Sequence, residues 1–184
     1  TVAIDPFESG LGLTAPRFAS SIILVTAGPI IKPYVSQKLS DVHTVSGPGE
    51  YEIQGMMIHG VAVGATIAYT LRTEDITIAF FGGLASPTDI SADALEALST
   101  ADIVCLPVGG APHLDAAAAV TLIKKLGPKI VIPSFYAIPG LKRKCDGVGV
   151  FEKAIGQHPE PQEKLSIKAK ELIWEGTKLT VLKS

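Results

Sequence analysis

Apolar residues follow two different spacings along this chain, and the change falls near its middle. In the first half, short β-rich runs alternate with Gly, Pro and polar turns. This pattern predicts strands over residues 1–4, 21–26, 42–46, 51–53, 56–63, 66–72 and 76–81. The polar turn Thr73-Glu74-Asp75 joins the last two. The first half is therefore expected to be largely antiparallel β-structure.

In the second half, predicted helices alternate with buried strands. Ser91 and Asp115 can each cap a helix, and Gly127 followed by Pro128 closes the second one. A third helix is predicted over residues 148–155, with strands over 103–106, 130–132, 165–167 and 179–182. The pattern fits an α/β sandwich of two mixed sheets with helices outside, although periodicity alone does not separate this from other α/β sandwiches.

Composition and charge narrow the class of protein. The chain has 184 residues, of which 47% are hydrophobic and 18% charged, so we expect one globular domain spanning residues 1–184. The net charge of -2 argues against a nucleic-acid partner, and we interpret the short basic run 142–144 as a solvated loop. The longest apolar stretches are shorter than the roughly 20 residues of a membrane helix, so no membrane association is expected.

The two cysteines and the N-terminal residues indicate the cellular compartment. Cys105 and Cys145 lie far apart in the sequence, and Cys105 sits in an apolar run, so we predict no disulfide scaffold. No signal peptide is visible, and a reducing, cytoplasmic setting is predicted. The chain does not begin with Met, which suggests that residues before Thr1 are missing.

Several strings occur in an order and spacing typical of one protein family. They are Ile4-Asp5-Pro6-Phe7, residues 47–53 (GPGEYEI), Ile58-His59-Gly60, residues 106–110 (LPVGG), residues 130–133 (IVIP) and residues 139–142 (PGLK). Together they resemble the metallo-β-lactamase-fold superfamily, in the branch of zinc-dependent hydrolases related to ascorbate-6-phosphate lactonase. The resemblance covers nearly the whole chain and implies an αββα sandwich. It also implies that two strands that normally precede the Asp5 segment lie upstream of Thr1 or are absent.

The same resemblance implies a zinc site, yet this sequence lacks its ligands. The family binds zinc through a His-x-His-x-Asp-His motif, a bridging Asp and a late His, because imidazoles and carboxylates suit that ion. The positions that align with these ligands hold other residues here: Ala27, Pro29, Ile31, Lys32, Gly83 and Phe135. Replacing a whole polar cluster with apolar groups can be nearly neutral for stability, whereas losing a single ligand leaves unpaired polar groups. We therefore predict no metal and no cofactor.

Other polar residues are candidates for the former pocket. Asp5, Asp115 and Tyr136 could face it, with alternative interpretations as a loop-ordering acceptor, a helix N-cap and a half-buried core residue. Lys32 and Tyr136 could also hydrogen-bond an anion. The four histidines, His43, His59, His113 and His158, show no ligand spacing and are interpreted as structural.

The functional hypothesis is a non-catalytic relative of a zinc hydrolase that acts as a structural or protein-interaction subunit. We expect its partner to be a second copy of the chain or a different protein. Two alternatives stay open. One is a hydrolase of the same superfamily with a rebuilt or metal-free site, and the other is a module that binds a small molecule.

Overall fold

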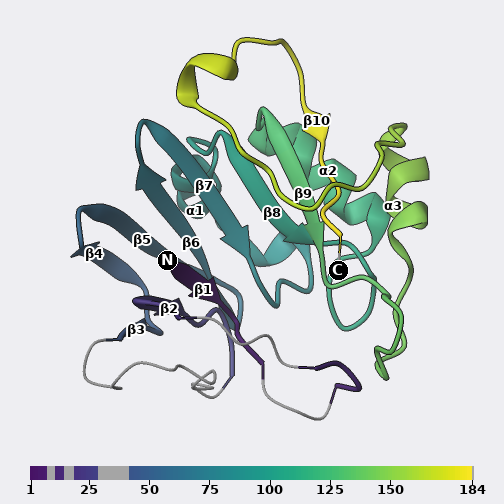
Figure 1. Cartoon of the computed structure of the whole chain (residues 1–184), viewed down its shortest axis with the longest axis horizontal. Coiled ribbons are helices and arrows are strands. Elements are labelled where there is room, and N and C mark those ends of the chain that lie inside the picture. Colours follow the sequence, from purple (N-terminus) through teal and green to yellow (C-terminus); the bar gives the residue numbers. More distant parts are fainter. Residues whose placement is uncertain (8–10, 15–18, 29–41, 184) are drawn as a thin grey trace.

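The computed structural model describes residues 1–7, 11–14, 19–28 and 42–183. Its described strands form two sheets (Figure 1). The smaller sheet has the order β1-β2-β3, and its strands run parallel: Val2–Ile4, Ile22–Leu24 and His43–Val45. The larger has the order β10-β9-β8-β7-β6-β5-β4, with strands Lys178–Leu179, Ile130–Ser134, Ile103–Pro107, Ile76–Phe81, Thr66–Thr73, Met56–Val63 and Gly49–Ile53.

The larger sheet is mixed, and its two halves match the two spacings in the sequence. Strands β4 to β7 pair antiparallel, as the period-two alternation predicts. Strands β7 to β10 pair parallel, with helices between them. The carboxyl ends of β7, β8 and β9 therefore lie along one edge of this sheet. Ligands in α/β proteins bind at such edges, so this edge is the natural place for a site.

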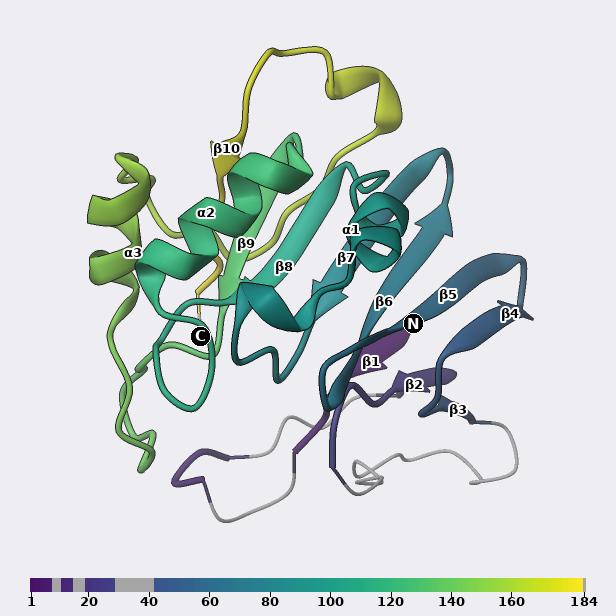
Figure 2. The same ribbon diagram turned by 180° about the vertical axis from the view of Figure 1, so that it is seen from behind.

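Three helices cover one face of the larger sheet (Figure 2). They are α1 (Ala92–Leu98), α2 (Ala116–Leu126) and α3 (Val148–Ile155), with a short 3₁₀ turn at Pro87–Asp89 before α1. The predicted caps are confirmed: the Ser91 and Asp115 side chains accept from Ala94 N and Ala118 N, and Gly127 adopts a left-handed φ of 62°. The apolar faces of all three helices pack into one core cluster with the sheet.

The opposite face of the larger sheet packs against the smaller sheet. Ile22, Leu24 and Val45 from the smaller sheet bury against Ile58, Tyr69 and Leu71 from the larger one. Tyr69 is fully buried, and its hydroxyl donates to the carbonyls of Val25 and Val45 at 3.1 and 3.3 Å. Burial of this phenol raises its pKa to about 12, so it stays a neutral donor that joins the two sheets. The predicted α/β sandwich is thus confirmed.

The C-terminal segment departs from the prediction. We predicted a strand over 165–167, but these residues have no ladder partner and form no strand. Instead, Leu165, Ile167 and Trp174 pack over Ile103 and Ile130 on the sheet face opposite the helices, on either side of a 3₁₀ turn at Ala169–Glu171 (Figure 1). An apolar-polar-apolar triplet buries alternate side chains both when it pairs within a sheet and when it packs across the face of one. The alternation therefore predicted a strand over 165–167 where the chain only covers the sheet.

The second closing strand is shorter than predicted. Strand β10 spans Lys178–Leu179, so only Leu179 of the predicted 179–182 lies in it, and Leu182 forms an isolated bridge with Gln162. No helix within the described ranges is long and apolar enough to cross a membrane.

Candidate functional site

The first part of the candidate site is a hydrogen-bonded pair at the ends of β1 and β2. The Asp5 carboxylate accepts from the backbone N–H of Thr26 at 2.8 Å and from its hydroxyl at 2.6 Å. A side chain on Gly82 would collide with Thr26 Oγ1 and Asp5 Oδ2, so Gly82 lies directly against this pair. Burial raises the pKa of Asp5 above its usual 3.8, and the two bonds from Thr26 oppose that shift. Asp5 thus acts as an acceptor that fixes the loops.

The second part lies one residue further along the same loops. A Cβ built on Gly83 lies 3.6 Å from Ala27 Cβ and 3.9 Å from His113 Cε1. The His113 ring meets the Phe135 ring edge-on, with centroids 4.7 Å apart. Three of the predicted ligand-replacement positions, Ala27, Gly83 and Phe135, are therefore brought together around His113. The other three, Pro29, Ile31 and Lys32, lie outside the described residues.

Arg143 completes this group. Its guanidinium lies over the Phe135 ring, 5.5 Å from the centroid, and Nη1 lies 3.0 Å from His113 Nε2. Nη2 donates to the Phe135 carbonyl at 3.4 Å. We call Ala27, Gly83, His113, Phe135 and Arg143 the arginine cluster. The interpretation of residues 142–144 as a solvated loop is wrong for Arg143, since only the two flanking lysines are exposed.

The backbone of Phe135 is unusual. Its φ of 55° is left-handed, a conformation that costs about 1 kcal/mol or more for a residue with a Cβ. The Phe135 carbonyl also lies where a Cβ of Gly109 would be, so the loop after β8 approaches it very closely. Such strain persists only where the surroundings hold the residue in place, and it concentrates at functional sites.

His113 is electrostatically coupled to the arginine. Burial, followed by the nearby charge of Arg143, lowers the pKa of His113 below 6.5, while the backbone of Gly83 partly opposes the shift. A guanidinium can only donate, so His113 Nε2 must accept, and the ring is neutral with its proton on Nδ1. Arg143 Nε is buried without a hydrogen-bond partner among the described residues, and the buried His113 Nδ1 has only a weak contact with the Gly83 backbone.

A cavity of about 210 Å³ adjoins both parts of the site. Its walls are mostly apolar and come from the ends of β1, β7, β8 and β9: Ile4, Asp5, Phe80, Phe81, Gly82, Cys105, Ser134 and Phe135. Burial raises the pKa of the Cys105 thiol to about 12. It therefore stays protonated at neutral pH and is a poor nucleophile.

The remaining candidates lie elsewhere. Asp115 caps α2 and is exposed, in line with the N-cap interpretation. The Tyr136 hydroxyl donates to the carbonyl of Leu182 at 3.3 Å, so it links the β9 loop to the C-terminal segment. Burial raises its pKa, and Glu152 adds to the shift. Neither residue contributes to the arginine cluster.

Sequence reasoning missed His113 and Arg143. Neither belongs to a motif: His113 sits in a Gly/Pro loop after β8, and Arg143 sits between two lysines after β9. The one available signal was topological, since both loops leave the carboxyl ends of neighbouring parallel strands and must converge.

The residues present do not fit a zinc ion. Ala27, Gly83 and Phe135 have no donor atom in their side chains, and the accepting nitrogen of His113 already faces a permanent cation. Within the ranges that the structure describes, no group of three or more His, Cys, Asp or Glu side chains could hold a metal ion.

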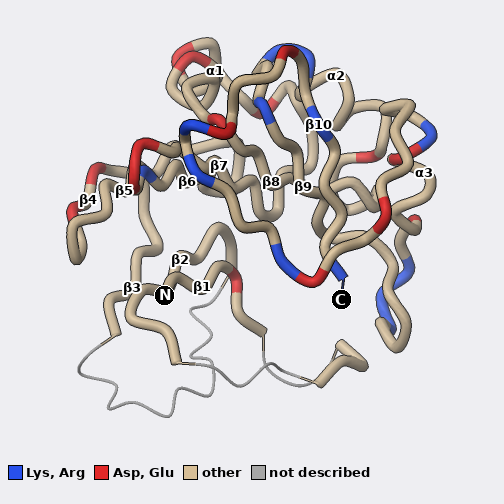
Figure 3. The backbone as a smooth tube through the Cα atoms, turned by 45° about the horizontal axis from the view of Figure 1, so that its top comes forward, with Lys and Arg blue, Asp and Glu red and all other residues tan. Residues whose placement is uncertain are grey.

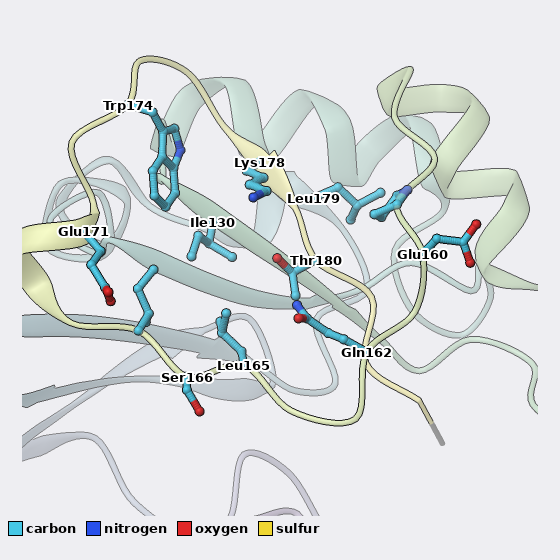
Figure 4. Close-up of a pocket in the computed structure, with 12 residues that line it drawn as sticks. Ile130, Glu160, Gln162, Leu165, Ser166, Glu171, Trp174, Lys178, Leu179 and Thr180 are labelled. Atoms are coloured by element: carbon cyan, nitrogen blue, oxygen red, sulfur yellow. The ribbon is translucent and has the colours of Figure 1, made fainter.

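A second pocket, of about 400 Å³, lies under the C-terminal segment (Figure 4). Trp174 and Leu165 face Ile130 across it, and the Lys178 ammonium lies 5.7 Å from the centre of the Trp174 ring. Trp174 and Lys129 exchange two hydrogen bonds, of 3.3 and 2.8 Å, that fix the segment on the sheet. The pocket is therefore a gap between the C-terminal segment and the face of the larger sheet that this segment covers.

Within the described residues, Lys and Arg positions form no long uninterrupted run along the backbone. Lys and Arg positions occur in short groups separated by acidic ones along the described chain (Figure 3). The two ion pairs found among the described residues, His158–Glu152 and Lys183–Glu163, both lie outside the arginine cluster.

Comparisons with known proteins agree on the family and the fold. The family model described as a beta-lactamase superfamily domain matches residues 1–134. Among curated proteins, none matches the sequence significantly. A Thermotoga maritima protein described as a zinc-dependent hydrolase of the metallo-β-lactamase superfamily is 20% identical, with a TM-score of 0.78 over 98% of this chain and 88% of that one. A Parabacteroides distasonis protein described as a metal-dependent hydrolase is 16% identical, with a TM-score of 0.54 over 90% and 78%.

Proposed function

This chain belongs to the beta-lactamase superfamily domain family, and from that premise we propose that it is a member without zinc-dependent hydrolysis. The observation that carries the proposal is the arginine cluster. Catalysis by zinc in proteins needs three side-chain ligands and an open position for water. Three of the aligned positions here meet around His113, whose ring faces the Arg143 guanidinium. That group supplies a positive charge but no Lewis acid and no bound hydroxide.

Metal content and hydrolysis test the proposal together. Protein purified without chelator, and then incubated with zinc and dialysed, is expected to hold far less than one zinc per chain. The His113→Ala variant should match the wild type in zinc content. His43→Ala, which removes an exposed imidazole in β3, is the control. Stoichiometric zinc that disappears in His113→Ala, together with zinc-stimulated hydrolysis, would refute the proposal.

We further propose that the chain acts as a structural or interaction subunit, paired with a copy of itself or with another protein. Supporting this, β4 and β1 lie at the outer edges of the two sheets, and neither outer edge is paired within the described residues. Unpaired edges expose N–H and C=O groups that a strand from another chain can engage. Light scattering on the native protein, with affinity capture from its own cell extract, tests this. A monomer that captures no partner would contradict it.

A further inference from the structure

We propose that the arginine cluster binds a small molecule through an oxyanion, a carboxylate or a phosphate group, with Arg143 as the anchor. The inference extends the proposed function. It shares one premise with that proposal, namely that the cluster does not bind zinc. It assigns a ligand class to residues that sequence motifs did not single out.

The first argument is the unbalanced charge of Arg143. A guanidinium stays charged at any physiological pH and offers five N–H donors. Two of these are used, toward His113 Nε2 and the Phe135 carbonyl, and both of those partners are neutral. Neither ion pair found among the described residues includes Arg143. A partly buried cation of this kind is stabilised when an anion supplies the missing charge.

The second argument is an unused buried donor. Arg143 Nε–H is buried and makes no hydrogen bond within the described residues. His113 Nδ1–H is also buried, and it has only a weak contact with the Gly83 backbone that falls short of good hydrogen-bond geometry. A buried donor that stays unpaired is unfavourable. Both groups donate, so the partner that the site lacks is rich in acceptors. A carboxylate or a phosphate has this property, whereas a cation does not.

The third argument is location. The cluster is built from loops after β2, β7, β8 and β9, at the edge where parallel strands end. Phe135 is shared with the 210 Å³ cavity, whose mostly apolar wall can receive the remainder of a small ligand. Ala27 and Gly83 pack closely beside His113, so the open volume next to the cluster is the cavity that Phe135 lines.

The acidic group that lines the adjoining cavity does not fill the anion's role. Asp5 lines the same cavity, but both of its carboxylate oxygens already accept hydrogen bonds from Thr26. Burial favours its neutral form. Asp5 forms no ion pair with Arg143 among the described residues.

Calorimetric titration with sodium phosphate and, separately, with sodium acetate tests the proposal, against sodium chloride at matched ionic strength. We expect at least one oxyanion to bind the wild type, with an affinity at least about tenfold weaker in Arg143→Met, because a hydrogen bond to a charged group is lost. Arg143→Lys keeps the charge but loses the planar fork, so it should also weaken binding. Lys144→Met, which removes an exposed neighbouring charge, should leave the affinity unchanged.

A second readout tests the site directly. An anion beside His113 must raise the pKa of its imidazole, which NMR titration of the histidine ring signals measures with and without phosphate or acetate. The shift should occur in the wild type and in Lys144→Met and be absent in Arg143→Met, whose folding circular dichroism verifies. Equal affinity in Arg143→Met and Lys144→Met, or no oxyanion binding at all, would overturn the inference. Zinc measured in the same samples reports separately on the proposed function.

Discussion

The Asp5–Thr26 pair and the arginine cluster are built from adjacent residues of the same loops, yet they differ in how well their polar groups are satisfied. Thr26 and Gly82 belong to the first, and the next residues, Ala27 and Gly83, belong to the second. In the pair, every donor and acceptor of the interaction is used. In the cluster, the buried Arg143 Nε–H is unpaired among the described residues. Each region holds one residue at a left-handed φ, Asp5 at 43° and Phe135 at 55°, so backbone strain does not distinguish them. The pair stabilises the loops. In the cluster, and within the described chain, Arg143 keeps an unpaired N–H donor and a charge without a counter-ion, which a bound anion would satisfy.

The largest expected effect comes from the two neighbouring glycines. Gly82→Ala forces a methyl group into Thr26 Oγ1 and Asp5 Oδ2, and overpacking of this kind should lower the free energy of unfolding by about 3 kcal/mol. In Gly83→Ala the nearest atom, Thr66 Cγ2, lies at 3.3 Å, so the cost should stay below about 1 kcal/mol. Urea denaturation of both variants measures the difference. Equal losses would remove the distinction between the two regions.

Removing the carboxylate of the pair should have the next largest effect. Asp5→Ala leaves the Thr26 N–H and hydroxyl unpaired, and we expect a loss of about 2 kcal/mol. Asp5→Asn should lose less, because an amide oxygen still accepts and Asn tolerates the φ of 43°. The same denaturation series measures both.

The charge on Asp5 adds a pH dependence to that series. Its folded pKa lies above 3.8, so its stabilising contribution is complete below that pH and declines as the pH rises through the folded pKa. The stability of the wild type relative to Asp5→Asn should therefore fall as the pH rises from below 3.8. A constant difference across that range would mean that burial does not perturb Asp5.

A smaller effect is expected from the backbone of Phe135. Replacement by Gly should cost about 1 kcal/mol less than replacement by Ala, because only Gly relieves the left-handed strain. At the neighbouring Tyr136, where the φ is not positive, the usual order should return and Gly should be worse than Ala. Thermal unfolding of the four variants makes the comparison, and the same order at both positions would argue against strain at Phe135.

The smallest expected effect is the pH dependence of His113. Its folded pKa is below 6.5, so the neutral ring stabilises the protein above that pH, and this stability is lost as the pH falls toward the folded pKa. His113→Gln, which stays neutral, should lose less stability than the wild type on acidification through this window. Melting temperatures measured in parallel buffers report it. Identical pH profiles would show that burial and Arg143 do not lower the pKa of His113.

Local patterns predicted most of the secondary structure. Caps at Ser91 and Asp115 and the turn at Gly127 depend on neighbouring residues only, so they could be recognised without a fold. The apolar triplet at 165–167 could not, because the strand and the sheet cover bury alternate residues in the same way. Whether residues 165–167 pair with a neighbouring strand depends on segments far away in the sequence.

The sequence by itself determined the family, the α/β sandwich and the absence of ligating side chains at the aligned positions, because these depend on residue types and their order. Only the tertiary structure decided what replaced those ligands. His113 and Arg143 lie 30 positions apart, in loops without a motif, and their contact exists because β8 and β9 are neighbouring parallel strands whose carboxyl ends share one edge. Residues distant along the chain become a charged site only when the sheet pairing places them together.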